Sequence, residues 1–345
     1  MPVPLVNVTL SASTVNSNAP VATYSSLLEI STARLRRHNM WDALLRNTTR
    51  IAAIAVLVLL GAVIASLIQG SIPSMKAFGW GYLTGTTWNP VTEKFGALPA
   101  VYGTVVTSII AMLIGIPVSL GIAVFITELC PRPLKRPIST AIELLAGVPS
   151  IIYGIWGLFV LAPVLQQHVQ PVLISLFGPI PLLSTIFAGP PYGIGILTAG
   201  IILSIMVLPY ITSVTRDVFE TVPAVLKESA YGLGATTWEV VRNVVLPYCR
   251  TGVIGGIMLG LGRALGETMA VTFVIGNAHK IASSILAPGT TISASIANEF
   301  TEADSDLYNS ALIELGLILF VITFVVLACA RLLLLRMEMK AGSRA

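Results

Sequence analysis

Six long apolar segments dominate this chain and decide what it can fold into. Each matches the roughly 20 mostly apolar residues that a helix needs to cross the hydrocarbon core of a bilayer. Backbone polar groups cannot stay unpaired in lipid, so such segments must form helices or the strands of a closed barrel. Runs such as IAAIAVLVLLGAVIASLI lack the period-two alternation of a barrel strand. The sequence therefore predicts an all-α integral membrane protein with about six spans, at residues 51–69, 101–127, 138–165, 193–213, 252–275 and 310–335.

The composition supports the same class of protein. Residues of the hydrophobic types make up 55% of the 345 residues, and charged residues only 10%, against about 25% charged residues in a typical soluble domain. Three cysteines and three histidines lie apart from one another, without the spacing of a disulfide framework or a metal site. The chain also lacks a nucleotide-binding P-loop and a nucleophile-elbow motif. We therefore expect no enzyme activity, no cofactor and no metal in this chain, and an energy source elsewhere.

The basic residues predict how the chain is oriented in the membrane. Sixteen of the 20 lysines and arginines precede the first span, follow the last, or lie in the loops between spans 2 and 3 and between spans 4 and 5. Three lie in the other loops, and Arg263 lies inside a span. Because positively charged loops stay in the cytoplasm, both termini are predicted to be cytoplasmic. The net charge of +4 then reflects topology, and we expect no nucleic-acid partner.

The two ends of the chain differ from the membrane domain at residues 51–335. Residues 1–33 contain no lysine or arginine and are rich in small polar residues, which favours a mobile polar tail over a secretory signal. Residues 34–50 combine arginines with one apolar face, made by Met40, Trp41, Leu44 and Leu45. That pattern is typical of an interfacial amphipathic helix leading into the first span. Residues 336–345 are expected to form a short cytoplasmic tail.

The loop at residues 214–251 is the longest predicted cytoplasmic loop. Pro223 is placed to begin a short helix, which the glycines at 232 and 234 interrupt. A second short amphipathic helix is expected from Trp238, with Pro247 at its end. Two patterned helices on the inner membrane surface would form a docking platform, although a simple connector is the alternative.

Four landmarks in this loop occur at the spacing of a known family. The sequence Glu228-Ser229-Ala230 is followed by Gly234 after six residues and by Leu246-Pro247 after 18 and 19. The loop thus resembles that of ATP-binding-cassette importer permeases, whose pattern is Glu-Ala-Ala, Gly and Ile-x-Leu-Pro. Ser229 and Val244 are the two mild departures. The resemblance implies a MetI-like permease fold and a coupling loop that seats in a groove of a separate ATPase.

Longer stretches narrow the resemblance. Residues 142–163, 229–247, 252–277 and 311–327 are similar to a permease subunit of phosphate-specific importers, and the likeness extends over about 50–335. It implies transport of inorganic phosphate across the bacterial plasma membrane, with ATP and magnesium bound by the ATPase. The implied partners are a PstA-like second permease, two PstB-like ATPase subunits and a PstS-like extracytoplasmic phosphate-binding protein. Another oxyanion, such as sulfate or molybdate, and an ion-coupled secondary transporter remain alternatives.

Four ionisable residues interrupt the apolar segments: Glu143, Arg263, Glu267 and Glu314. Charges in lipid are costly, so each should face the bundle interior or an aqueous cavity. Arg263 lies about 16 Å into the fifth span, near the midplane, and Glu267 is one turn further on the same face.

Two interpretations of the Arg263–Glu267 pair stay open. The guanidinium fork matches two oxygens of a phosphate, and Glu267 would hold Arg263 while the anion is absent. The alternative is a structural ion pair between helices. Glu143 and Glu314 lie nearer the ends of their spans and are weaker candidates for the substrate path. Glycines at 255, 256, 260, 262 and 266 indicate close helix packing or a cavity beside the pair.

Overall fold

The computed structural model describes residues 21–342 and divides the chain into two units, residues 1–65 and 66–345, each treated by itself below. Within the described residues six helical segments are long and apolar enough to cross a membrane. They are Asn39–Phe78, Leu98–Leu129, Ser150–Phe177, Ile196–Glu220, Thr237–Leu265 and Asp306–Arg336. The prediction of an all-α protein with six spans is confirmed.

Helices make up most of the described chain. The α-helices are α1 (Val21–Phe78), α2 (Gly81–Thr84), α3 (Leu98–Val124), α4 (Arg132–Ala146), α5 (Ser150–Trp156), α6 (Ala162–Val164), α7 (Gln170–Phe177), α8 (Pro181–Ile186), α9 (Ile196–Glu220), α10 (Ala224–Gly232), α11 (Thr237–Val240), α12 (Leu246–Leu265), α13 (Met269–Val274), α14 (Ile292–Glu299) and α15 (Asp306–Gly342). Four π-helical turns join some of them: η1 (Phe125–Leu129), η2 (Gly157–Leu161), η3 (Leu165–Val169) and η4 (Val241–Val245).

The described part of the first unit is helical. Residues 21–65 belong to α1, which continues to Phe78. The predicted interfacial segment at 34–50 is therefore continuous in helix with the first span, and its placement at a membrane surface stays a prediction. Of the predicted polar tail, residues 1–20 lie outside the described residues.

The third span begins later than its hydropathy suggests. Pro149 is extended, with a ψ of 136°, and separates α4 from α5. Proline disfavours the helical conformation in the residue before it, which explains the break. Residues 138–146 therefore belong to α4, and the span runs from Ser150 to Phe177 through two π-helical turns. The predicted bounds of 138–165 were therefore wrong, because the span both begins and ends 12 residues later.

The fifth span differs from its prediction in two ways. Pro247 does not end a helix: the π-helical turn η4 directly precedes α12, and the helical backbone continues through the proline. A continuous helical segment therefore runs from Thr237 to Leu265. The chain then breaks over residues 266–268 before α13 begins. The expected single span at 252–275 is two helices.

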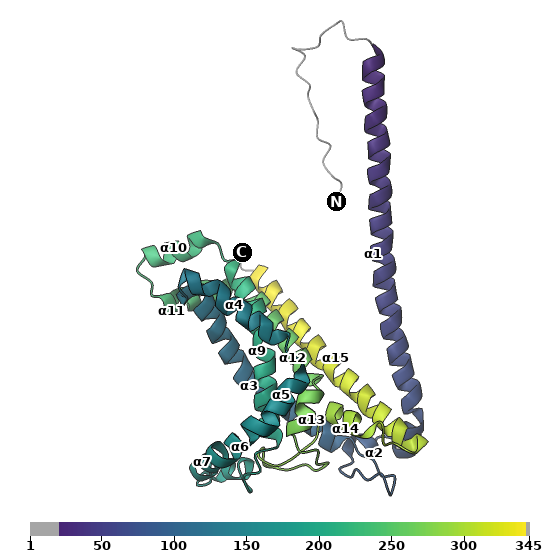
Figure 1. Cartoon of the computed structure of the whole chain (residues 1–345), viewed down its shortest axis with the longest axis vertical. Coiled ribbons are helices and arrows are strands. Elements are labelled where there is room, and N and C mark those ends of the chain that lie inside the picture. Colours follow the sequence, from purple (N-terminus) through teal and green to yellow (C-terminus); the bar gives the residue numbers. More distant parts are fainter. Residues whose placement is uncertain (1–20, 343–345) are drawn as a thin grey trace. The chain divides into compact units, whose positions relative to one another are not determined.

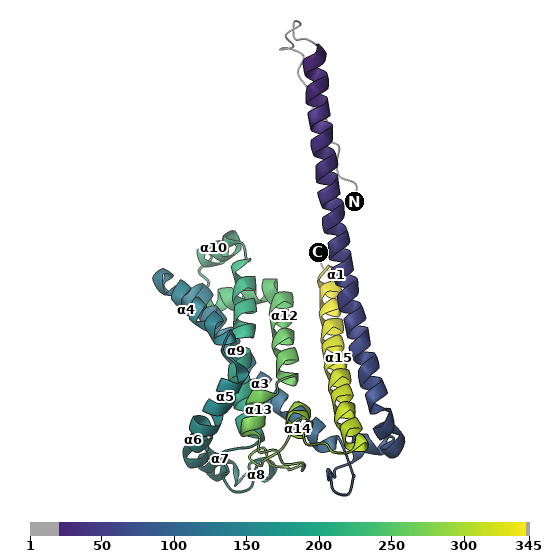
Figure 2. The ribbon, with the colours of Figure 1, turned by 45° about the vertical axis from the view of Figure 1, so that its right-hand side comes forward.

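The spans of the second unit pack around α9, the most buried of the six. It contacts α3, α12 and α4 (Figure 1; Figure 2). Glycines on α12 allow close packing: a Cβ added at Gly260 would lie 2.7 Å from Ile211, and one at Gly256 would lie 3.2 Å from Val214. At these two positions the span 5 glycines serve helix packing.

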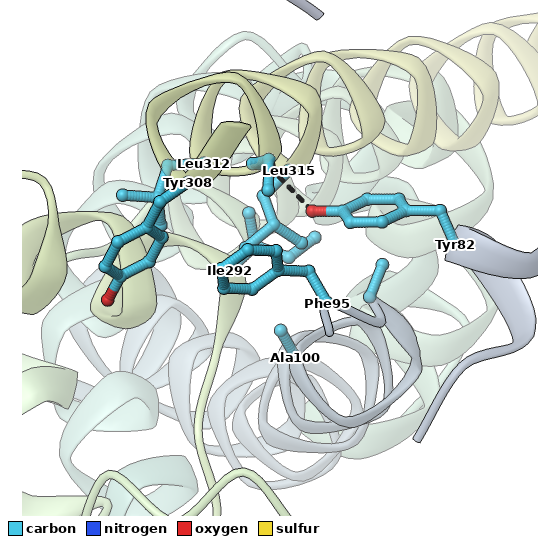
Figure 3. Close-up of a cluster of buried hydrophobic side chains, with 9 residues drawn as sticks. Tyr82, Phe95, Ala100, Ile292, Tyr308, Leu312 and Leu315 are labelled. Atoms are coloured by element: carbon cyan, nitrogen blue, oxygen red, sulfur yellow. Dashed lines mark hydrogen bonds between the residues drawn. The ribbon is translucent and has the colours of Figure 1, made fainter. Parts of the chain in front are cut away.

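The end of this unit opposite α10 is closed by an aromatic core (Figure 1; Figure 3). Tyr82 and Phe95 pack there with residues of α14 and α15, and the Tyr82 hydroxyl donates to the Ala311 carbonyl at 2.6 Å. Burial raises the pKa of Tyr82 well above its ordinary value. The core ties the segment before α3 to the start of the last span.

The Glu299 carboxylate makes three side-chain hydrogen bonds beside this core. Trp88 Nε1 and the Tyr308 hydroxyl donate to Oε2 at 2.6 and 2.5 Å, and His279 Nε2 lies 2.6 Å from Oε1. Burial opposes ionisation of this carboxyl, but the three hydrogen bonds outweigh it and hold the pKa of Glu299 below its ordinary value. One carboxylate thus joins α14, α15 and two loops.

Candidate functional site

Arg263 lies in the last turn of α12, directly before the break in the fifth span. Its side chain is 35% exposed. Its Cζ lies 4.7 Å from the centre of the Tyr210 ring on α9, which is a cation–π contact. The buried Nε has no hydrogen-bond partner among the residues that the structure describes. The guanidinium is therefore held by a ring face while one of its donors stays unpaired.

Glu267 lies in the break between α12 and α13 and is buried, with 7% of its side chain exposed. Its Oε2 is 4.0 Å from Arg263 Nη2, well beyond the 2.7–2.9 Å of a charge-assisted hydrogen bond. Its Oε1 accepts a hydrogen bond from the Ala270 backbone N–H at 3.3 Å. The structure brings the two predicted residues together, but Glu267 is engaged more closely with the first turn of α13 than with Arg263.

Two tyrosines beside Arg263 were missed by sequence reasoning. The Tyr210 hydroxyl donates to the Ala146 carbonyl at 3.2 Å, and the Tyr153 hydroxyl donates to the Leu145 carbonyl at 2.9 Å. Both bonds reach the last residues of α4, which precede the break at Pro149. A tyrosine inside an apolar span needs a partner for its hydroxyl, and that need was the available signal.

The other two charged candidates lie elsewhere. Glu143 on α4 accepts a hydrogen bond from Arg216 Nη1 at 2.7 Å, and half of its side chain is exposed. Glu314 on α15 is buried and borders an apolar cavity of about 630 Å³ lined also by Met75, Trp80 and Leu83. Neither Arg263 nor Glu267 lines that cavity. The four predicted charged residues thus lie at three separate sites: Arg263 with Glu267, Glu143 beside Arg216, and Glu314 at the apolar cavity.

The loop at 214–251 forms α10 as a separate short helix, as predicted, but the second predicted helix is the first part of the continuous segment that runs from Thr237 to Leu265. Pro223 caps α10, and Thr236 and Glu239 form a capping box at the start of α11. Glu228 and Ser229 are exposed, Ala230 is half-buried, and Leu233 is 90% exposed.

Gly234 turns the chain between these helices with a φ of +84°. That is a conformation which glycine adopts without cost. A Cβ added at Gly234 would meet nothing within 4 Å in this chain. The backbone angle is therefore what requires glycine here.

The loop is fastened to the membrane bundle on its inner side. Lys227 Nζ lies 2.5 Å from Glu128 Oε1 at the end of the second span, with 19% and 7% of the two side chains exposed. Val240 and Val245 pack with Phe219 in a buried apolar cluster. Leu246 is half-buried and Pro247 exposed. Several large apolar side chains of the loop are exposed, among them Val225, Leu226, Tyr231, Leu233 and Trp238.

Residues 115–339 match the family model described as the binding-protein-dependent transport system inner membrane component. That range contains the loop and Arg263. A crystal structure of a bacterial ABC transporter involved in the import of the acidic polysaccharide alginate is similar in fold. The TM-score is 0.56 and the identity 18%, over 88% of this chain and 99% of that chain.

Several relatives are much closer in sequence. The phosphate transport system permease protein PstC of Mesorhizobium japonicum is 66% identical over 90% of this chain and 95% of its own length. The protein of the same name from Pasteurella multocida is 58% identical over 89% and 96%. The phosphate transport system permease protein PstC 1 of Mycobacterium tuberculosis is 38% identical over 75% and 82%.

Proposed function

The chain belongs to the family of binding-protein-dependent transport system inner membrane components, and we propose that it carries inorganic phosphate inward as one permease subunit of an ATP-driven importer. The relatives that are 66% and 58% identical over the aligned residues carry phosphate transport in their names. Six apolar spans provide the multi-pass membrane domain that such a role needs. The matched family and these relatives favour neither another oxyanion nor an ion-coupled secondary transporter.

Arg263 is the observation that carries the proposal at the level of the site. It is a fixed positive charge within a membrane span, partly exposed, with a nitrogen that has no partner in the described chain. An oxyanion leaving water loses hydration, and a guanidinium restores part of that energy through charge and through paired N–H donors. The distance of 4.0 Å to Glu267 leaves the positive charge only weakly paired. The arrangement suits transient contact with an anion.

The loop at 214–251 is proposed to dock the ATPase. The loop exposes several large apolar side chains and the carboxylate of Glu228, and exposed apolar side chains close together are typical of sites that bind a partner protein. Gly234 keeps the turn between its helices in a backbone conformation that few other residues adopt. We propose a PstB-like ATPase, which binds ATP and magnesium, as the partner of this loop. This chain itself would bind neither.

The remaining partners follow from the same proposal. A PstA-like permease completes the heterodimer, and a PstS-like binding protein delivers phosphate at the end of the bundle opposite α10. The distribution of basic residues supports a cytoplasmic position for α10 and for both chain termini. The protein would then reside in the bacterial inner membrane.

The central test compares variants of the span 5 pair in the assembled importer. Arg263→Ala should lose phosphate uptake while the complex still assembles, and Arg263→Lys should keep part of it, because an ammonium lacks the planar fork. Glu267→Gln should impair uptake by altering the balance of charge at the site. Uptake is measured in reconstituted vesicles and normalised to assembled complex.

The double variant Arg263→Met/Glu267→Leu separates transport from a structural role. A purely structural ion pair can be replaced by apolar residues of similar volume with little loss of stability. Under the proposed function this double variant assembles but does not take up phosphate. Substantial uptake by the double variant would refute the role of Arg263 as an anion site.

A further inference from the structure

We propose that Tyr210 is the positioning residue for Arg263, holding the guanidinium by its ring face so that the N–H donors stay available to the passing anion. The inference rests on the proposed role of Arg263 in phosphate transport. The sequence analysis expected Glu267 to hold Arg263 while the anion is absent, and we assign this role to Tyr210 on the fourth span instead.

The contacts of Arg263 point to the ring and not to the carboxylate. Its Cζ lies over the Tyr210 ring at 4.7 Å, within the roughly 6 Å over which a ring face attracts a cation. Glu267 Oε2 is 4.0 Å from the nearest guanidinium nitrogen and makes no hydrogen bond to it. Of the contacts that the structure gives to this guanidinium, the one with Tyr210 is the one at favourable geometry.

The chemistry of the two kinds of partner explains why a ring is the better holder. A carboxylate binds the same N–H donors that an oxyanion needs, so the anion would have to displace it. A ring attracts the positive charge through its quadrupole and does not occupy those donors with a lone pair. Tyr210 can therefore fix Arg263 before, during and after contact with phosphate, without competing with it.

Tyr210 is itself fixed at its other end. Its hydroxyl donates to the Ala146 carbonyl at the end of α4, and Tyr153 reaches the adjacent Leu145 carbonyl. The ring is half-buried on α9, the most buried span. The position of the ring is thus set by two helices, while the ring in turn positions a residue on a third. The contact links α4, α9 and α12 at Arg263.

The experiment replaces Tyr210 in the full importer, assembled with its partner subunits. Tyr210→Phe keeps the ring and loses the hydroxyl, so uptake should stay within about threefold of the unchanged protein. Tyr210→Leu keeps comparable bulk and loses the ring, and uptake should fall at least about tenfold, the scale of a well-formed cation–π contact. Tyr153→Phe is the matched control, because it removes an equivalent hydroxyl contact from a ring for which the structure gives no cation–π contact.

A fluorinated series separates positioning from packing. Phenylalanine with one, two and three ring fluorines is introduced at position 210, which weakens the ring's attraction for a cation with little change in shape. Uptake of inorganic phosphate should fall stepwise along the series, and so should the thermal midpoint of the assembled complex. In an Arg263→Gln background the midpoint should stay constant along the series.

The outcomes distinguish this inference from the proposed function. A flat uptake series, or equal losses in Tyr210→Phe and Tyr210→Leu, would overturn the positioning role. A stepwise midpoint series together with an Arg263→Gln importer that still takes up phosphate would refute the anion site instead, while leaving the ring contact in place. Stepwise losses of both uptake and midpoint support the inference.

Discussion

Removing Lys227 should destabilise the second unit and release the loop at 214–251 from the membrane bundle. Lys227 Nζ lies 2.5 Å from Glu128 Oε1, and only 7% of the Glu128 side chain is exposed. Lys227→Met therefore leaves a buried carboxylate without its cation, which costs about 3–5 kcal/mol in comparable cases. Glu128→Gln should cost less, about 1–3 kcal/mol, because Lys227 is 19% exposed and can turn toward water.

Thermal unfolding of the purified importer measures the loss, and copurification of the ATPase measures docking. Replacing both partners, as Glu128→Leu/Lys227→Met, should recover most of the stability, since no buried charge is left unpaired. The matched control is Lys135→Met, whose partner Glu220 lies at 3.4 Å with half of its side chain exposed. An exposed pair of this kind contributes at most about 1 kcal/mol.

Comparing Lys227→Met with Lys135→Met tests whether the Lys227–Glu128 pair contributes more stability than an exposed ion pair. The reasoning predicts a much larger drop in the midpoint for Lys227→Met than for Lys135→Met, with weaker ATPase copurification in the first variant alone. Equal drops would show that the Lys227–Glu128 contact is no stronger than a surface pair. A double variant as unstable as Lys227→Met would show that the lost energy came from packing and not from the unpaired charge.

Three further outcomes are expected. In a background without native cysteines, Phe300→Cys should react with an impermeant thiol reagent from outside intact cells and Leu233→Cys should not, and the opposite labelling pattern would reverse the orientation. Gly234→Val should abolish uptake and weaken ATPase copurification in a permease that still inserts, whereas Gly234→Asn should be milder, because asparagine tolerates a positive φ better than a β-branched residue does; normal transport by the valine variant would contradict this. The hydrogen bonds that lower the pKa of Glu299 stabilise the fold above its ordinary value of 4.5, and that contribution is lost as the pH falls toward the lowered value. Thermal midpoints measured from pH 7 to about pH 3 should therefore fall more for the unchanged protein than for Glu299→Gln, and parallel curves would count against the contribution.

The sequence predicted those features of the fold that depend on local pattern. Hydropathy gave the six spans, because the cost of burying unpaired backbone in lipid allows few other structures. The start of α10 after Pro223 and the special conformation of Gly234 followed from the backbone preferences of proline and glycine.

The span limits could not be predicted as well, because breaks depend on single residues inside apolar runs. Pro149 divides the third apolar segment, yet hydropathy alone reads through it. Pro247 was predicted to end a helix, but the helical backbone continues from η4 through Pro247 into α12. A π-helical turn leaves no obvious mark in the sequence, so the continuous segment at 237–265 could not be seen in advance.

The candidate site was predicted in part. An arginine and a glutamate one turn apart in an apolar segment are conspicuous, and Arg263 and Glu267 do lie together. Spacing along one helix said nothing of Tyr210, whose contact with Arg263 depends on how α9 packs against α12. The break at 266–268 also directs the Glu267 carboxylate toward the Ala270 N–H, an orientation that an unbroken helix would not give.

The continuous segment from Thr237 to Leu265 gives the two proposed sites a common helical element. It begins at the capping box in the loop at 214–251 and ends two residues after Arg263, so about 40 Å of helix joins the ATPase-docking region to the proposed anion site. The break at 266–268 separates α13 from this segment, and the Glu267 carboxylate accepts its hydrogen bond from the first turn of α13. The structure therefore places Arg263 on the helical segment that begins in the loop, and binds Glu267 to the helix on the other side of the break.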